Sequence, residues 1–338
     1  MRVAVLGLGF MGSTHIEALR QIAGAELAAV YSSDEKKLAG DLRSVGGNLG
    51  ARNGQVDFSG VQKYREVEAA LADSAIEAVD ICLPTYLHDV VAVEALRAGK
   101  HVLVEKPIAI DAYGADRMMA AARRSKRVLM TAHVLRFSPE YEALRKAVRQ
   151  ATYGGLRLAQ FRRRCAAPQW SDWLKDTAKC GGGAFDLLIH DVDMVLHLFG
   201  KPKAVSACGA VDQKRGLDTM EAHLFYEGGA VAVVSGGWLY PGEYPFCAEY
   251  AVTLEGGTIE YRSGGRPPMR YGADGSIEVL ETAGWDGYRA EIEYFLECCR
   301  TGQTPEFCPP AESADAVKMM TLLMEARSRN GVKLACRI

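Results

Sequence analysis

The chain begins with a strand-like run that leads directly into three spaced glycines. Residues 2–6 (RVAVL) precede a GxGxxG run, and hydrophobic residues at helical spacing follow it. In such a run the first glycine permits a tight turn, the second lets the backbone approach a pyrophosphate, and the third lets helix and strand pack closely. The N-terminus of the helix then offers N–H groups and the positive end of a dipole to phosphate oxygens. We therefore predict a dinucleotide-binding loop whose cofactor contacts are Gly7, Gly9, Phe10, Met11 and Gly12.

Strand-like and helical runs alternate through the first 135 residues. The strand-like runs are 2–7, 26–31, 77–84, 101–107 and 127–133, with helical runs at 12–22, 89–99 and 111–125. Asp111 is expected to cap its helix, and Gly99 is expected to follow the end of another. The glycine-rich polar segment 40–60 is expected to form a surface loop. This alternation predicts a doubly wound parallel sheet with helices on both faces, an NAD(P)-binding Rossmann domain over residues 1–125.

The second half of the chain has a different pattern. Its strand-like runs are 157–165, 203–211, 220–227, 230–240, 249–255 and 257–262, and several of them are separated by glycine-rich turns. Only a helix at 184–199 and two helices near the C-terminus interrupt them. Residues 126–338 are therefore expected to form an α+β domain with a large, mostly antiparallel open sheet, used for substrate binding and oligomerisation. If one face of that sheet lacks helical cover, a homodimer or homotetramer through it is expected.

The composition excludes several classes of partner. The 338-residue chain carries a formal net charge of −2, so no general positive field attracts nucleic acid or an anionic membrane. No apolar run has the length that a bilayer requires. The nine cysteines are scattered without a CxxC pair, which favours free thiols in a reducing compartment. We expect a cytoplasmic protein that acts on a small molecule.

The residues after the second strand bear on cofactor choice. NAD-preferring proteins hold the ribose 2′-OH with Asp or Glu at this point. This chain has Ser32 and Ser33 there, and Asp34 is better placed to cap the next helix. Without a carboxylate to repel it, a 2′-phosphate could be bound by these two serines and by Lys36 or Lys37. NADP is therefore favoured over NAD, with NAD kept as the alternative.

A largely apolar helix at residues 184–199 carries four ionisable groups on one stripe. On a helical wheel, Asp186, His190, Asp193 and His197 fall within roughly 60°. Buried charge is costly unless it is paired or used, so this stripe indicates a function. A single histidine of this kind is more often a hydrogen-bonded core residue, and the stripe could also hold a metal ion. We expect no metal, because no Cys/His cluster reinforces the set.

Four segments together identify a resemblance that covers the chain in order. GLGFMGSTH, PTYLHDVVAVEALRAGKHVLVEKPIA, HVLRFSPEY and GGGAFDLLIHDVD are similar to successive motifs of the Gfo/Idh/MocA oxidoreductases, which include relatives of glucose–fructose oxidoreductase and inositol dehydrogenase. The EKP triplet and the D-x-x-x-H pair are the specific motifs, whereas GxGxxG is generic. The missing acidic residue at Ser32 is the departure from NAD-specific members.

The resemblance implies roles for particular residues. Lys106 matches the family lysine beside the nicotinamide, and Asp186 and His190 match its substrate-binding aspartate and catalytic histidine. Further cofactor contacts implied by the matched motifs are Pro84, Thr85, His88, Glu105, Lys106 and Arg136. The implied catalytic residues Lys106, Asp186 and His190 are also expected to contact the substrate.

The residues support the same chemistry when read on their own. Oxidation of a secondary alcohol needs a base, and His190 has a suitable reference pKa of ~6.5. Asp186 lies one helical turn earlier on the same face, where it can orient the imidazole or bind a second hydroxyl. Lys106 would place positive charge near a developing alkoxide. We expect an NAD(P)-dependent oxidoreductase that transfers hydride between the nicotinamide and a sugar, polyol or inositol-like alcohol.

Some features remain open at this stage. Trp170 and Trp173 precede the charged helix, where they could stack on a sugar ring or fill an apolar gap. Asp193 could contact substrate, and His197 is expected to be structural. Two other functions fit the same resemblance: an NAD-dependent glycoside hydrolase that acts by transient oxidation, and a dinucleotide-binding regulator without catalysis.

Overall fold

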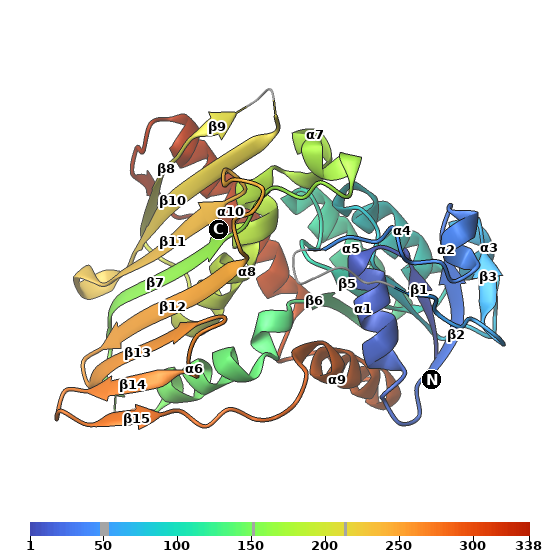
Figure 1. Ribbon diagram of the computed structural model, residues 1–338, viewed down its shortest axis with the longest axis horizontal. Coiled ribbons are helices and arrows are strands. Elements are labelled where there is room, and N and C mark those ends of the chain that lie inside the picture. The colour runs from blue at the N-terminus through green and yellow to red at the C-terminus, as the bar shows by residue number, and fades with distance from the viewer. Residues whose placement is uncertain (48–53, 151–152, 213–214) are drawn as a thin grey trace. The chain divides into compact units, whose positions relative to one another are not determined.

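A computed structural model describes residues 1–47, 54–150, 153–212 and 215–338 (Figure 1). The chain forms two compact units. The first unit comprises residues 1–134 and 286–314, and the second comprises residues 135–285 and 315–338. In the described part of the chain, no helix is long and apolar enough to cross a membrane. All nine cysteines are free thiols.

The first unit is built on a parallel sheet of six strands. The strand order is β3-β2-β1-β4-β5-β6, and every neighbouring pair is parallel. The strands are β1 (Arg2–Leu6), β2 (Glu26–Tyr31), β3 (Gln62–Tyr64), β4 (Ala78–Ile81), β5 (His101–Glu105) and β6 (Leu129–Ala132). The order reverses between β1 and β4, and open sheets of this kind bind ligands at the carboxyl ends of the strands beside such a reversal.

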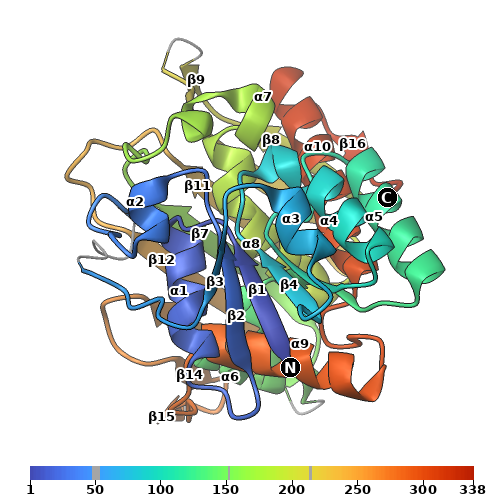
Figure 2. The same cartoon turned by 90° about the vertical axis from the view of Figure 1, so that its right-hand side faces the viewer.

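Helices cover both faces of this sheet, which confirms the predicted doubly wound fold. Figure 2 shows α3, α4 and α5 on one side, and α1 and α9 pack against each other on the other. The helices are α1 (Phe10–Leu19), α2 (Glu35–Leu38), α3 (Val67–Ala72), η1 (Thr85–Leu87), α4 (His88–Arg97), α5 (Ala112–Ser125) and α9 (Gly287–Thr301). Because both faces are covered, β4 is buried along its whole length and reads as a nearly continuous apolar run.

The second unit contains a ten-stranded sheet that is antiparallel at every pair except β7–β11, which is parallel. The prediction of a large, mostly antiparallel sheet is confirmed. The path is β15-β14-β13-β12-β7-β11-β10-β8-β16, with β9 paired to β10. The strands are β7 (Leu156–Arg164), β8 (Ala204–Cys208), β9 (Val211–Asp212), β10 (Leu217–Phe225), β11 (Val231–Gly237), β12 (Cys247–Leu254), β13 (Gly257–Arg262), β14 (Met269–Gly272), β15 (Ile277–Val279) and β16 (Leu334–Ala335).

Helix α8 lies against one face of this sheet, where it contacts β7, β10 and β11. Tyr141 of α6 packs on the same sheet, with its ring centre 5.3 Å from that of Tyr250 in β12. The helices of the second unit are η2 (Val134–Arg136), α6 (Pro139–Arg149), η4 (Asp172–Lys175), α7 (Thr177–Cys180), α8 (Gly183–Phe199), η5 (Glu227–Gly229) and most of α10 (Pro310–Ser328).

The compact units differ from the division expected at residue 125. Strand β6 pairs with β5, so the first unit extends to residue 134. Helix α9 packs on α1, so residues 286–314 also belong to the first unit although they follow most of the second. Helix α6 and the strands β3, β14, β15 and β16 were not expected from the sequence. The predicted loop at 40–60 lies partly outside the described residues, while Asp41 and Gln55 form an isolated bridge at its base.

Candidate functional site

The three glycines of the first loop each meet a different steric demand. Gly7 has a φ of +110°, and a Cβ there would lie 2.4 Å from the carbonyl oxygen of Cys82. A Cβ on Gly12 would lie 1.8 Å from the carbonyl oxygen of Gly7, so helix α1 packs directly on the turn. A Cβ on Gly9 would meet nothing within 4 Å, which leaves open space beside the backbone. These are the tight turn, the close packing and the open approach that a pyrophosphate requires.

The start of helix α1 suits an anion. Its N-terminal cap is Gly9, which brings no side chain, and the first turn holds no acidic residue to offset the helix dipole. The first N–H groups of a helix have no acceptor within the helix, so they can point at phosphate oxygens. The loop geometry therefore fits the two phosphates of a nicotinamide dinucleotide.

The end of β2 carries the residues expected near the ribose. Ser32 is buried, and its hydroxyl accepts a hydrogen bond from the Asp34 N–H at 3.1 Å. Asp34 in turn caps α2 by accepting from the N–H groups of Lys36 and Lys37, as the sequence predicted. Ser33 is exposed and Lys37 is half-buried. The hydrogen bonds of the Asp34 carboxylate to the start of α2 therefore account for this residue without a contact to the ribose.

His88 joins two segments expected to contact the cofactor. The side chain is 1% exposed, with Nδ1 lying 2.8 Å from the Pro107 oxygen and Nε2 lying 2.8 Å from the Leu83 oxygen. It therefore ties the loop after β4 to the segment after β5. Thr85 is buried and Pro84 half-buried in the same loop. The structure gives His88 a task in holding the two loops together, and its predicted contact with cofactor stays a prediction.

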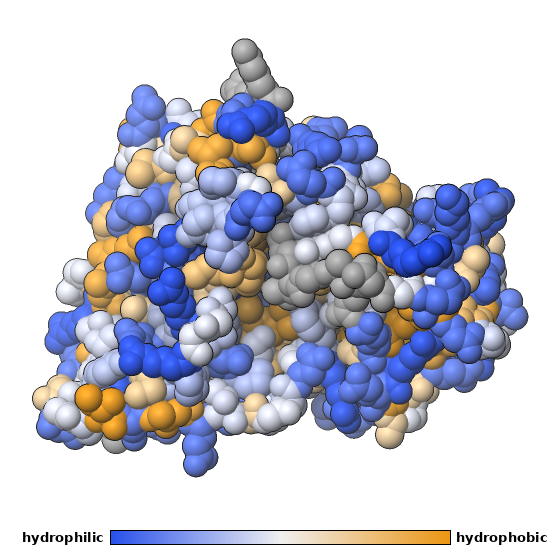
Figure 3. Space-filling model, in the orientation of Figure 1, coloured by the Kyte–Doolittle hydropathy of each residue, from blue (hydrophilic) through white to orange (hydrophobic). Residues whose placement is uncertain are grey.

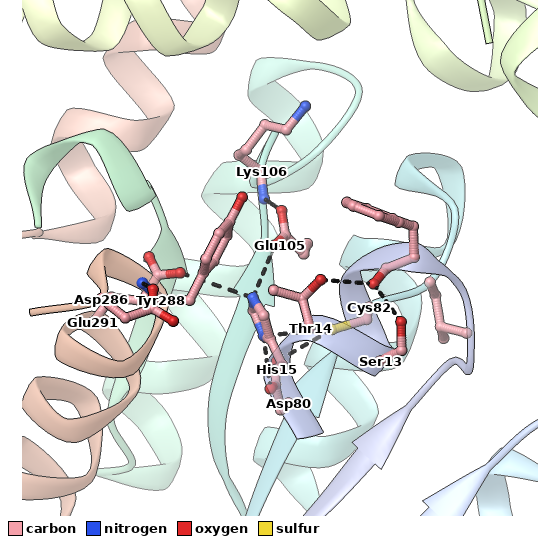
Figure 4. Close-up of polar contacts among 12 residues, drawn as sticks. Ser13, Thr14, His15, Asp80, Cys82, Glu105, Lys106, Asp286, Tyr288 and Glu291 are labelled. Carbon is pink, nitrogen blue, oxygen red and sulfur yellow. Dashed lines mark hydrogen bonds and ion pairs between the residues drawn. The ribbon is translucent and has the colours of Figure 1, made fainter. Parts of the chain in front are cut away.

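Lys106 follows the last residue of β5 and is half-buried. Its backbone N–H donates to Glu105 Oε2 at 3.0 Å. Figure 4 shows its side chain pointing away from the carboxylates that gather below it. Glu105 is 6% exposed, so its carboxylate lies in the interior of the first unit. Its predicted contact with cofactor stays a prediction.

A buried set of ionisable residues lies below Lys106, and we call His15, Asp80, Glu105 and Glu291 the His15 cluster (Figure 4). His15 Nδ1 lies 2.8 Å from Asp80 Oδ2, and Nε2 lies 3.1 Å from Glu105 Oε1 and 3.8 Å from Glu291 Oε1. Cys82 Sγ lies 3.5 Å from Asp80 Oδ1. The ligand atoms of His15, Asp80 and Cys82 lie close enough together to bind one metal ion. The 2.8 Å distance between His15 Nδ1 and Asp80 Oδ2 is also that of a direct hydrogen bond between the two side chains.

The pKa values within the His15 cluster move in opposite directions. Burial opposes the charged imidazole of His15, but Asp80 and Cys82 together outweigh it, and they hold the pKa of His15 well above its usual value. Burial also opposes the charged form of Glu105, yet the His15 imidazole lowers the pKa of that carboxyl. Burial raises the pKa of Glu291 well above its usual value. These directions favour the charged imidazole at His15, the carboxylate at Glu105 and the neutral acid at Glu291.

In the second unit, Asp186 and His190 lie in the first half of α8 and are both half-buried. They are separated by one helical turn, so their side chains leave the helix on the same face. His197 is half-buried in the last turn. The roles expected for these three residues stay predictions.

The glycines before α8 have structural reasons. A Cβ on Gly183 would lie 2.7 Å from the ring of Trp238, which is 2% exposed, so the helix starts flat against that ring. Gly182 has a φ of +93°. Asp218 Oδ1 then accepts from the Ala184 N–H at 2.7 Å and caps the helix from β10. The entry to α8 is thus fixed by the sheet of its own unit.

Two other aspartates of α8 are buried in ion pairs with arginine. The Asp193 carboxylate accepts hydrogen bonds from Arg136 Nε at 2.9 Å and from Arg136 Nη2 at 2.6 Å, and both side chains are 1% exposed. Asp191 receives Arg163 Nε at 2.8 Å and Nη2 at 2.9 Å. The Arg136 guanidinium, for which the resemblance implied a cofactor contact, is bound to Asp193 inside the second unit. Asp193 is therefore paired with arginine, and its contact with substrate stays a prediction.

The two tryptophans upstream of α8 differ in their surroundings. Trp173 packs against a core cluster of Cys165, Cys180, Leu187 and Trp238, as an apolar filler would. Trp170 is 40% exposed. Of the two predicted sugar contacts, only Trp170 therefore presents a substantial exposed surface, and both assignments stay predictions.

Comparison with known proteins agrees with this arrangement. Residues 1–133 match the model of an oxidoreductase family with an NAD-binding Rossmann fold, and residues 141–260 match the GFO/IDH/MocA C-terminal domain. With the loop geometry above, these matches define the class as an NAD(P)-dependent oxidoreductase. The chain belongs to the Gfo/Idh/MocA family.

Named relatives are similar over much of the chain. A myo-inositol 2-dehydrogenase of Thermotoga maritima is 29% identical over 69% of this chain and 67% of its own length. A UDP-N-acetylglucosamine 3-dehydrogenase of Acidithiobacillus ferrooxidans is 29% identical over 91% of both chains. The crystal structure of GenD2 from gentamicin A biosynthesis, in complex with NAD, superposes with a TM-score of 0.82 at 21% identity, covering 100% of this chain and 97% of that one. This last likeness shows the fold alone.

Sequence reasoning missed several buried ionisable residues. Asp80 sits inside an apolar strand, and Glu291 lies in a helix far along the chain with no motif around it. Arg163 was recognisable in part, since strand alternation places it on the same face as Ala159 and Phe161 of β7. For none of these three residues does the sequence indicate which residue is the partner.

Proposed function

We propose that the chain transfers hydride between NADP and a secondary alcohol or ketone of a sugar, polyol or inositol-like substrate, with Lys106, His190 and Asp186 in the reaction. The observation that carries the proposal is the glycine loop, whose steric demands match a pyrophosphate site, in a chain that also carries EKP and D-x-x-x-H motifs. The two dehydrogenase relatives act, by their names, on a cyclitol and on a nucleotide sugar.

The roles follow from the chemistry of each side chain. Nicotinamide, when bound, accepts or supplies the hydride. His190 takes the hydroxyl proton of the alcohol as the C–H bond breaks, and returns it in the reverse direction. Asp186, one turn earlier, orients the imidazole or binds a neighbouring hydroxyl. The Lys106 ammonium stabilises negative charge on the reacting oxygen. Trp170 offers an exposed ring on which a sugar could stack.

Preference for NADP is proposed on the residues after β2. Ser32 and Ser33 bring no negative charge, the Asp34 carboxylate accepts from the cap of α2, and Lys37 lies in that helix. A 2′-phosphate would therefore meet hydroxyls and a cation. The test follows, by absorbance, the reduction of NADP and of NAD with the same substrate. The ratio of the two kcat/KM values then shows which cofactor the protein prefers.

Two substitutions test the proposed reaction. A panel of sugars, polyols and inositols is first screened with both cofactors. His190→Ala is expected to lower kcat about 10²–10⁴-fold and Lys106→Ala about 10²–10³-fold, with dinucleotide affinity retained. Glu293→Gln, an exposed change on α9, serves as the control and should leave kcat unaltered. Unchanged turnover in either alanine variant removes that residue from the mechanism.

We also propose a homo-oligomer formed through the second unit, in a reducing compartment such as the cytoplasm. Strand β15 ends the ten-stranded sheet, and its Ile277 and Val279 are 67% and 57% exposed. Figure 3 shows apolar side chains gathered over β14 and β15. An exposed apolar edge strand favours association with another chain. Light scattering of wild type and of Ile277→Lys tests this, because the charged variant should shift the mass toward the monomer.

A further inference from the structure

The His15 cluster joins four elements of the first unit at one buried point. His15 comes from α1, Asp80 from β4, Glu105 from β5 and Glu291 from α9. All four side chains are at most 8% exposed. Three carboxyl groups around one imidazole would leave a net charge of about −2 in a buried volume if all were ionised, which is strongly unfavourable. The cluster must therefore retain a proton in addition to the one on His15.

The contacts of Glu291 favour it as the residue that holds this additional proton. Its side chain is 0% exposed, and neither of its carboxyl oxygens has a hydrogen-bond partner among the described residues. Asp80, by contrast, lies at hydrogen-bond distance from His15, and Glu105 lies against His15 and accepts from the Lys106 N–H. Burial without a donor favours the neutral acid at Glu291. Other groups facing it or the cluster are Tyr288 and Asp286 at the start of α9, Cys82 just after β4, and Lys106 and His88 near Glu105.

Glu105 connects this cluster to the candidate lysine. One of its oxygens lies 3.1 Å from His15 Nε2, and the other accepts the backbone N–H of Lys106. The position of that carboxylate therefore fixes the chain at Lys106. His15 is the cation that fixes the carboxylate, and it sits on the same helix whose N-terminus forms the dinucleotide loop.

We propose that His15 and Glu105 are positioning residues for Lys106, and that Glu291 is a buried proton store that switches them. While Glu291 is protonated, the His15 imidazolium is held by Glu105 and Asp80. When Glu291 loses its proton, a third carboxylate competes for His15 Nε2 from 3.8 Å, and the Glu105 contact that anchors Lys106 loosens. This inference rests on the proposed role of Lys106 in catalysis.

The first test is a pair of matched Glu→Gln substitutions. Glu105→Gln removes the charge that holds His15 and is expected to lower kcat about 10- to 100-fold, with the Kd for reduced dinucleotide within about twofold of wild type by fluorescence. Glu293→Gln is the control on α9. A kcat for Glu105→Gln within about twofold of wild type overturns the positioning role.

The second test is the pH profile of Glu291→Gln. The amide mimics the protonated acid at every pH, so the ratio of its kcat to that of wild type should rise as pH increases and ionises Glu291 in wild type. A merely structural Glu291 would give a ratio that does not change with pH. A flat ratio from about pH 5 to 9 overturns the switch.

A third measurement needs no substrate. Because the folded pKa of Glu291 is raised, the folded state keeps a proton that the unfolded chain has lost above about pH 4.5, and wild-type stability falls as pH rises through that window. The melting temperature of Glu291→Gln relative to wild type should therefore rise by about 3–6 °C per pH unit. A constant difference overturns the proton store. A rising difference combined with full activity of Lys106→Ala instead overturns the proposed function and leaves the proton store standing.

Discussion

The Arg163–Asp191 pair gives the sharpest test of the energetics of the second unit. Arg163 lies on the inward face of β7, and two of its nitrogens donate hydrogen bonds to the Asp191 carboxylate on α8 at 2.8 and 2.9 Å. Tyr141 of α6 accepts a third hydrogen bond from Arg163 Nη2 at 3.0 Å. The two charged side chains are 5% and 1% exposed. With Tyr141, the pair therefore links a strand and two helices away from water. The pKa of Arg163 is raised above its usual value, because Asp191 and Tyr141 together outweigh the effect of burial.

The magnitude follows from removing one partner. Asp191→Asn keeps the shape but leaves the Arg163 charge buried without a counterion, which costs about 3–5 kcal/mol. We expect a cost in the upper half of that range, because Asp191 orients the Arg163 guanidinium and its loss also weakens the hydrogen bond from Arg163 Nη2 to the Tyr141 hydroxyl. The double substitution Arg163→Met with Asp191→Leu removes both charges and should recover most of the loss, since a matched apolar pair is often neutral or better.

Thermal unfolding followed by circular dichroism measures the effect. For a unit of this size, Asp191→Asn should lower the melting temperature of the second unit by about 6–20 °C, and the double variant should lie well above it. Glu227→Gln, which breaks the exposed pair with Lys203, is the control and should leave the transition in place. The reasoning is refuted if Asp191→Asn melts within about 2 °C of wild type, or if the double variant is no better than the single one.

Three further outcomes are expected. Gly12→Ala should abolish measurable binding of reduced dinucleotide in a fluorescence titration while the second unit melts normally, because the added Cβ would lie 1.8 Å from the Gly7 oxygen. Ser32→Asp should reverse a preference for NADP in the ratio of kcat/KM values, because a carboxylate binds a 2′-OH and repels a 2′-phosphate. Leu188→Ala on the buried face of α8, where the side chain is 0% exposed, should cost about 2–5 kcal/mol in denaturant unfolding.

The sequence was most informative where one local pattern carries the structure. The GxGxxG run predicted the turn, the close packing and the open approach that Gly7, Gly12 and Gly9 show. The alternation of strands and helices predicted the parallel sheet, and Asp111 caps α5 through the Gly114 N–H as expected. These features depend on neighbours within a few residues, so a single sequence is enough to read them.

Partners that are distant in the sequence could not be predicted. The helical wheel placed Asp193 on the functional stripe, but its partner Arg136 lies in a short 3₁₀ turn that no periodicity marks. Glu291 looks like any charged residue of an amphipathic helix, and only the packing of α9 on α1 buries it beside His15. Buried charge pairs depend on tertiary packing, and the sequence shows the charges without showing which of them become buried.

The order in which the two units are completed has a consequence for synthesis. Strands β1 to β6 leave the ribosome within residues 1–134, but α9 follows only at residues 287–301. At 5–20 residues per second, roughly 8–30 s pass in between. During that interval His15 and Glu105 lack the helix that carries Glu291, and the nascent sheet is uncovered on one side where α9 packs against β5 and β6. A truncated chain ending near residue 134 would keep that side uncovered, so an expression plasmid for the dinucleotide-binding unit alone should also encode residues 286–314 through a linker.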